Sequence, residues 1–356
     1  MYAMASSVVT KKGKSIAGTK IKQPVGGLRY DWLMSIMGFL FVAGLYVDGW
    51  AHAHGRVDNT FFTPWHAVLY SGYLINAVLL VGTLFINHAR GLTWQKALPA
   101  GYELSLLGVP LFGMAGVGDM IWHTLFGFEV GVDQVLSPTH LVLASSGILI
   151  MTGPFRAAMR RRDSTTAPGW TRLLPMLLSL IALSLTFSFF TEFANPFVRT
   201  WTVTTPFQYE NLAQTLGVAS ILIQSGVLIG LILLAVRRWT LPFGALTLIF
   251  TLNIVLISVL ADQYQLIPAI VLAGIVADLL LRWLNPSLKR QNELRLFAFF
   301  VPLVLFLFYF VDLMITHGII WSIHLWLGSC VMAGIVGLVL SYLLVPPQGP
   351  HEETEE

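Results

Sequence analysis

Residues 209–236, which read YENLAQTLGVASILIQSGVLIGLILLAV, decide the class of this protein. Glu210 is the only charged residue in the run, which exceeds the roughly 20 residues that a helix needs to cross a hydrocarbon core of about 30 Å. Apolar runs of this kind recur from Trp32 to Leu344, and 56% of the chain is hydrophobic while only 11% is charged. A soluble domain carries roughly 25% charged residues, so the sequence predicts an all-α, polytopic transmembrane helix bundle.

We expect about ten membrane spans, at residues 31–50, 65–87, 99–122, 138–158, 172–194, 209–236, 241–261, 264–284, 294–316 and 320–344. Lys and Arg residues collect before the first of these spans and after the second, fourth, sixth and eighth. All of these loops fall on one side if all ten spans cross, and an excess of Lys and Arg marks the cytoplasmic side. The sequence thus predicts a multi-pass protein of the cell membrane with both termini in the cytoplasm.

The expected spans divide the chain into a four-span half at 31–160 and a six-span half at 170–345, whose role the sequence does not indicate. A basic segment at 1–30 and an acidic tail at 346–356 flank them. We interpret the basic segment as a cytoplasmic arm, because no short apolar stretch with a small-residue cleavage site precedes the first long run. Cys330 is the only cysteine, which excludes an internal disulfide, a thiolate zinc cluster and an iron–sulfur site made by this chain alone.

The first two hairpins of the four-span half share one pattern. Residues 48–72 read DGWAHAHGRVDNTFFTPWHAVLYSG, and residues 119–147 read DMIWHTLFGFEVGVDQVLSPTHLVLASSG. Both give Asp-x3-His, an acidic connector and Pro-x-His. Residues four apart share one face of a helix, and a proline suits the first turn of the next helix, which brings the last histidine back over the preceding helix end.

Each hairpin can therefore offer one carboxylate and two imidazoles to a single ion on the extracytoplasmic side. We name these residues the first set (Asp48, His52 and His66) and the second set (Asp119, His123 and His140). Two histidines and one carboxylate leave coordination positions open, which suits copper, non-haem iron or zinc catalysis. A hydrogen-bonded polar network that ties the paired hairpins together is the alternative interpretation.

Further polar residues near the same side give weaker signals. Residues that would orient the ligand imidazoles are His54, Asp58, Glu129 and Asp133, although solvation of the connectors explains them equally well. Additional candidate ligands in the last two spans are Asp312, His317 and His324. We interpret Glu192 and Arg199 as part of an ion-pair network in an outer loop.

The two hairpins resemble one membrane-embedded subunit of the copper membrane monooxygenases, the family of the ammonia and particulate methane monooxygenases. That subunit carries Asp-x3-His followed by Asp-Thr-x-Phe-Thr-Pro-x-His, where this chain has DNTFFTPWH at 58–66. It later carries Asn-x3-His and Ser/Ala-Pro-x-His, where this chain has Asp119, His123 and SPTH at 137–140. The resemblance extends over about residues 48–147 and implies two copper sites, of which the second set would be catalytic. Asp119 departs from the family's Asn, both connectors are longer, and the six-span half has no counterpart.

The resemblance and the ligand sets together predict a copper-dependent membrane monooxygenase-like protein or subunit. It would oxidise a small apolar substrate or ammonia with O2 at the extracytoplasmic face. The alternatives are a metal transport or delivery protein, a zinc-dependent membrane hydrolase with Glu129 or Asp133 as base, and a structural subunit. Expected partners are the lipid bilayer, a small-molecule substrate, and other monooxygenase-type subunits or further copies of the chain. No basic stripe for nucleic acid stands out.

Overall fold

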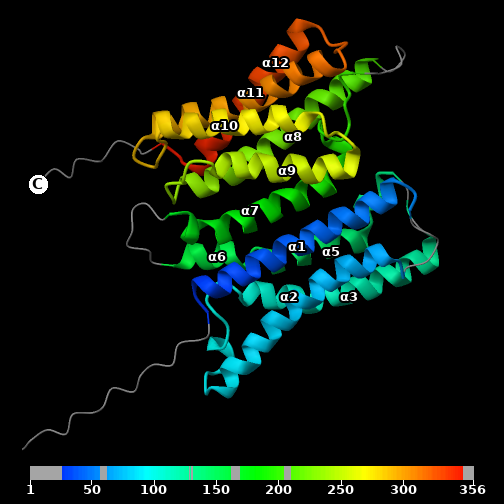
Figure 1. Ribbon diagram of the computed structural model, residues 1–356, viewed down its shortest axis with the longest axis vertical. Coiled ribbons are helices and arrows are strands. Elements are labelled where there is room, and N and C mark those ends of the chain that lie inside the picture. Colours follow the sequence, from blue (N-terminus) through cyan, green and yellow to red (C-terminus); the bar gives the residue numbers. More distant parts are fainter. Residues whose placement is uncertain are drawn as a thin grey trace, which may run out of the picture.

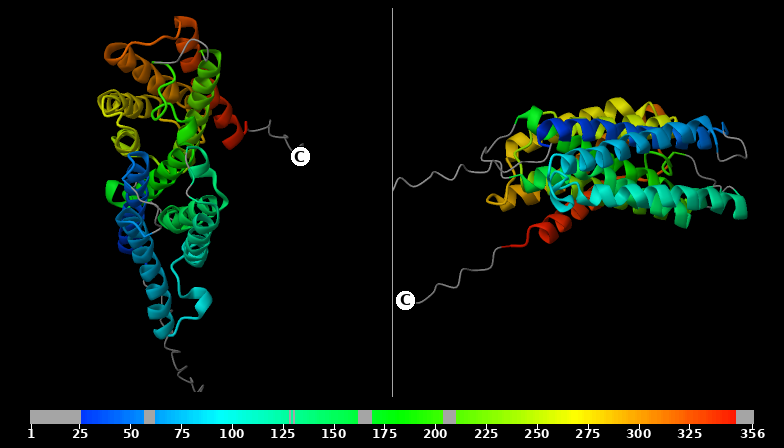
Figure 2. Two further views of the ribbon diagram at one scale, coloured as in Figure 1. Left: turned by 90° about the vertical axis from the view of Figure 1, so that its right-hand side faces the viewer. Right: turned by 90° about the horizontal axis from the view of Figure 1, so that it is seen from below.

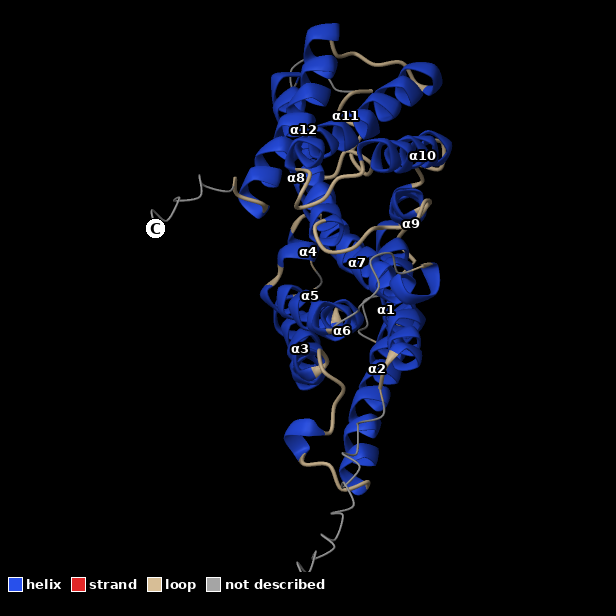
Figure 3. Ribbon diagram, turned by 90° about the vertical axis from the view of Figure 1, so that its left-hand side faces the viewer, coloured by secondary structure: helices blue, strands red, loops and turns tan. Residues whose placement is uncertain are grey.

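The computed structural model describes residues 26–56, 62–127, 129, 131–161, 169–203 and 210–347. All regular elements within these ranges are helices, as Figure 3 shows. The four-span half contains α1 (Leu28–Ala53), α2 (Pro64–Ala89), η1 (Trp94–Lys96), α3 (Glu103–Phe126), α4 (Asp133–Leu136), α5 (Pro138–Met151) and α6 (Gly153–Arg160). The six-span half contains α7 (Trp170–Phe190), η2 (Glu192–Ala194), α8 (Glu210–Val236), α9 (Ala245–Ala261), α10 (Leu266–Leu284), α11 (Gln291–Thr316) and α12 (Ile323–Leu344).

Eight of the described helices are long and apolar enough to cross a membrane, namely α1, α2, α3, α7, α8, α10, α11 and α12. The pair α5 and α6 makes a ninth if it is one span, and the apolar helix α9 is shorter. The predicted all-α polytopic bundle is therefore confirmed, while ten spans and cytoplasmic termini stay predictions. The α5–α6 pair bends by 41° just before Pro154, because a proline has no N–H to give to the helical ladder.

Helix α1 lies in the middle of the bundle (Figure 1) and packs against α2 on one side and against α7 and α9 on the other. Helix α3 packs against α5, and α8 and α10 to α12 form the opposite end of the elongated molecule. The helices run along roughly one direction when the bundle is seen from below (Figure 2). The ends of the hairpins α1–α2 and α3–α5 consequently lie at the same end of the bundle.

Glycines allow both hairpins to close tightly. A Cβ atom on Gly72 of α2 would lie 2.8 Å from the Cα of Phe41 in α1. A Cβ atom on Gly108 of α3 would lie 2.7 Å from the carbonyl oxygen of Ser146 in α5. Small residues let helix backbones approach closely within a membrane, where apolar burial gives no preference for helix over lipid. These close contacts hold the two helices of each hairpin together.

Candidate metal centres

The first set forms where α1 ends and α2 begins. Asp48 and His52 occupy the last two turns of α1, and His66 is the third residue of α2. Thr63 is the N-cap of α2, and its side-chain oxygen accepts a hydrogen bond from the backbone N–H of His66 at 3.1 Å. Pro64 takes the first helical position, where its missing N–H costs nothing. The cap therefore fixes the backbone that carries the imidazole.

The second set repeats this construction at the junction of α3 and α5. Asp119 and His123 occupy the last two turns of α3. Ser137 is the N-cap of α5, and its side-chain oxygen accepts a hydrogen bond from the backbone N–H of His140 at 3.4 Å, with Pro138 at the first helical position. The hydroxyl residue before each proline is thus part of the site. The predicted site did not include it, although Ser or Thr before a helix start is an N-cap signal.

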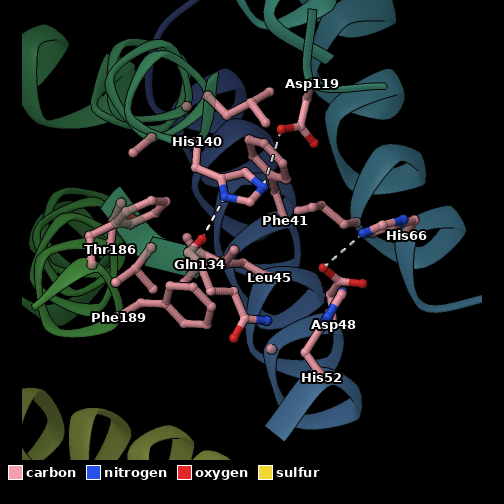
Figure 4. Close-up of a pocket in the computed structure, with 18 of the residues that line it drawn as sticks. Phe41, Leu45, Asp48, His52, His66, Asp119, Gln134, His140, Thr186 and Phe189 are labelled. Carbon is pink, nitrogen blue, oxygen red and sulfur yellow. Dashed lines mark hydrogen bonds and ion pairs between the residues drawn. The ribbon is translucent and has the colours of Figure 1, made fainter. Parts of the chain in front are cut away.

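Asp119 is the centre of the second set. Its Oδ2 lies 3.4 Å from Nε2 of His123. Its Oδ1 lies 3.3 Å from Nε2 of His140 (Figure 4). The hydroxyl of Thr139 donates to Oδ1 at 2.7 Å. Nδ1 of His140 donates to the backbone oxygen of Gln134 at 2.5 Å, which leaves Nε2 of the neutral ring as an electron-pair donor that faces a carboxylate. Two such donors repel each other unless a proton or a metal cation lies between them.

Glu129 lies beside the second set. Its Oε2 is 3.2 Å from Nδ1 of His123, the nitrogen that does not face Asp119. Both Glu129 oxygens are buried and have no hydrogen bond of good geometry among the described residues. A carboxylate at the outer nitrogen of an imidazole orients a metal-ligating ring and raises its basicity. The predicted orienting role is therefore compatible with the position of Glu129.

The first set is less completely hydrogen-bonded. Oδ2 of Asp48 lies 3.5 Å from Nε2 of His66, and the rings of His52 and His66 are 5.5 Å apart between centroids. Oδ1 of Asp48 is buried without a hydrogen-bond partner in the described parts of the chain. The position that corresponds to Thr139 is Trp65, whose indole N–H donates instead to the backbone oxygen of Arg56. An uncompensated carboxylate oxygen is costly at a buried position, and a bound cation would offset that cost.

Both sets have the spacing of a metal site. In each of them, one ligand atom from every residue lies within 4.8 Å of the other two. Ligand atoms held 2.0–2.1 Å from one ion at tetrahedral angles are roughly 3.4 Å apart. The closest carboxylate-to-imidazole separations are 3.5 Å in the first set and 3.3 and 3.4 Å in the second. The residues of both sets therefore fit a single ion each.

The two sets line one cavity of about 120 Å³. Most of the remaining wall is apolar, and it includes Phe41, Leu45, Leu69, Phe112, Leu143 and Met151. The six-span half closes one side of this cavity through α7 and η2, which contribute Thr186, Phe189, Phe190 and Glu192. Figure 4 shows Thr186 and Phe189 on the wall opposite Asp119 and His66. The sequence alone did not indicate that this half takes part in the site.

The other predicted orienting residues lie away from the cavity. His54 follows the last residue of α1 and turns toward α9, where its Nε2 lies 2.8 Å from Oδ2 of Asp262. This hydrogen bond raises the pKa of His54, and the residue ties two helix ends together instead of orienting an imidazole. Asp133 begins α4 and is exposed, outside the cavity wall. Asp58 lies outside the described residues.

Asp312, His317 and His324 do not form a third ligand group. Within the described ranges, only the first and second sets bring three such side chains within 4.8 Å of one another. Asp312 lies in α11, and Nδ1 of His317 is 2.7 Å from the hydroxyl of the neighbouring Thr316. His317 is the C-cap of this helix and no longer follows its helical geometry.

The comparisons with known proteins give no family. The chain matches no family model, no curated protein and no solved structure. The interpretation of the site therefore depends on its own residues and geometry.

We expect that Thr139→Val weakens metal binding at the second set about tenfold, because the carboxylate of Asp119 loses the hydroxyl that holds it. Loss of a hydrogen bond that orients a ligand lowers metal affinity by roughly 10–100-fold. Competition against a chelator measures the effect. Thr124→Val is the matched control, since this exposed threonine of α3 donates only to the backbone oxygen of Met120. Equal affinities of the two variants would contradict the assignment.

Proposed function

We propose that this protein is a copper-dependent membrane oxidoreductase of the monooxygenase type, or one subunit of such an enzyme. The observation that carries the proposal is the pair of Asp-His-His sets on one mainly apolar cavity. Three protein ligands leave positions open for a small molecule, whereas a structural site uses all four. The apolar wall favours a small substrate of low polarity that arrives through the bilayer, or ammonia.

The six residues of the two sets would hold the metal ions. Copper bound there would supply one-electron redox chemistry and reaction with O2. The second set is the stronger candidate for the catalytic centre, because Gln134, Thr139 and Glu129 hold its ligands in position. The phenylalanines around the cavity would exclude bulk water and leave space for the substrate beside the ligands.

The proposed location is the extracytoplasmic side of the cell membrane. Both sets lie at the end of the bundle opposite the loops that carry most Lys and Arg residues, and such loops face the cytoplasm. An electron donor and other subunits, or further copies of this chain, would complete the enzyme.

Metal analysis of the protein purified from its native membrane tests the proposal. We expect two equivalents of copper per chain, one lost in His52→Ala and the other in His123→Ala, together with substrate-dependent O2 consumption by the wild type. Zinc in place of copper would support a membrane hydrolase instead. A wild-type protein without bound metal would rule out metal catalysis and leave the polar network as the interpretation of both sets.

A further inference from the structure

Glu192 is the one carboxylic acid that the six-span half contributes to the described cavity wall. It begins η2, directly after the end of α7, and it faces the space that both sets line. Its carboxyl group has no hydrogen bond or ion pair with another described residue. Burial raises the pKa of Glu192, and the positive charge of Arg199, an exposed residue beyond η2, opposes this effect. Glu192 therefore lines the cavity and interacts electrostatically with an exposed arginine of the following segment.

Buried polar contacts hold the backbone around Glu192 in place. Gln224 of α8 donates from Nε2 to the hydroxyl oxygen of Thr191 at 2.8 Å. Tyr309 of α11 donates from its hydroxyl to the backbone oxygen of Pro196 at 2.9 Å. Both residues are buried. Helices of the six-span half thus support the short segment that presents this side chain, while no described residue holds the carboxyl group itself.

The other acids of the cavity are already engaged. Asp48 and Asp119 belong to the two sets, and Glu129 lies against His123. A carboxylate that holds an ion cannot also carry protons to and from the cavity. Tyr70 also lines the cavity, but a phenol has an ordinary pKa of about 10 and exchanges protons poorly near neutrality. Glu192 is the remaining candidate for proton exchange.

The proposed reaction needs such a group. Oxidation of a substrate RH by O2 with two electrons from a donor follows RH + O2 + 2e⁻ + 2H⁺ → ROH + H2O. The O–O bond breaks, one oxygen atom enters the R–O–H product, and the other leaves as water with the two protons. An apolar wall that excludes bulk water also excludes these protons. An acid with a pKa closer to the working pH than that of an ordinary glutamate transfers protons more effectively.

We propose that Glu192 is the proton-transfer residue of this cavity and passes protons between the loop end of the bundle and the space beside the two sets. The requirement for protons in this cavity rests on the proposed function. Proton exchange by the Glu192 carboxyl group does not depend on that function. The charged and titratable groups around Glu192 are Arg199 beyond η2, Tyr46 of α1, and the two sets, Tyr70 and Glu129 on the same cavity wall.

The first test uses metal-free protein in detergent and follows the infrared carbonyl band of protonated carboxyl groups during a pH titration and after transfer into D2O. We expect one component of this band to titrate at a pH above the usual range of a glutamic acid. The same component should exchange its proton for deuterium rapidly. It should be missing in Glu192→Gln and shifted in Glu192→Asp. Glu210→Gln is the matched control, because Glu210 begins α8, accepts from Gln214 and lies outside the cavity. If Glu192→Gln fails to fold, the shift in Glu192→Asp decides the test.

The second test uses copper-loaded protein. Loss of a proton-transfer group typically slows a reaction by roughly 10²–10⁴-fold. We expect a loss of about 100-fold in the turnover of Glu192→Gln at unchanged copper content, with partial recovery in Glu192→Asp. An unchanged infrared component or unchanged turnover in Glu192→Gln would overturn the proposal. If the wild type shows the infrared component but binds no copper, the proposed function fails while Glu192 remains the exchanging group.

Discussion

Asp119→Ala is expected to remove the metal ion of the second set and to leave that of the first set in place. Asp119 contacts both imidazoles of its set, and its Oδ1 also accepts from Thr139. Removal of this carboxylate takes away one of three protein ligands and the negative charge that attracts the cation. We expect an affinity loss greater than the roughly 10–100-fold that follows the loss of an orienting hydrogen bond.

Metal content after dialysis against a graded series of chelators measures this effect. Asp119→Asn keeps the size of the side chain and one ligand oxygen, so its loss of affinity should be smaller. Asp133→Ala removes an exposed carboxylate of α4 outside the cavity wall and should have no effect. Retention of both ions by Asp119→Ala would show that the second set is a polar network that ties α3 to α5.

Gly337→Ala is expected to cause the largest loss of stability, because the new methyl group would overlap the backbone of α11. Its Cβ would overlap the backbone carbonyl oxygen of Ala298, which is fully buried. A backbone atom cannot move aside as a side chain can, so α11 and α12 must separate. We expect a net destabilisation of about 3 kcal/mol, at the upper end of typical overpacking costs.

Thermal unfolding in detergent measures the difference, and Gly328→Ala is the matched control on the same helix. A Cβ atom at Gly328 would meet no other atom within 4 Å. This substitution should be neutral or stabilise the helix by up to about 1 kcal/mol, because alanine has the higher helix propensity. Equal melting temperatures of the two variants would mean that α11 and α12 are not in close contact at Gly337.

The sequence predicted the helices well because bilayer thickness constrains both the length and the composition of a span. The expected span at 209–236 corresponds to α8 (Glu210–Val236), and that at 294–316 lies within α11. The expected span at 138–158 is in fact the bent pair α5 and α6. Pro154, which lies at the start of α6, indicates this bend in the sequence. The length of an apolar run alone does not indicate such a break in the helix.

The residues of the two sets could also be predicted, because the spacing that brings them together lies within a single hairpin. Residues four apart on one helix share a face, and the pairs Thr63-Pro64 and Ser137-Pro138 fix where the second helix of each hairpin begins. Each set needs only one hairpin, so spacing along the chain is sufficient to bring its three residues together. Their close approach in the structure follows from this repeated pattern.

Packing between distant helices selects the segments that meet at the cavity. His54 lies only two residues from His52, yet it faces Asp262, which follows α9. Glu192 was assigned to a loop network but lines the cavity. Membrane helices are apolar on most sides, so their sequence pattern does not mark the face that packs against another helix. Local sequence was therefore sufficient to predict the helices and to bring the three residues of each set together, whereas the packing of α7 against α1 and α5 places Glu192 in the cavity that both sets line.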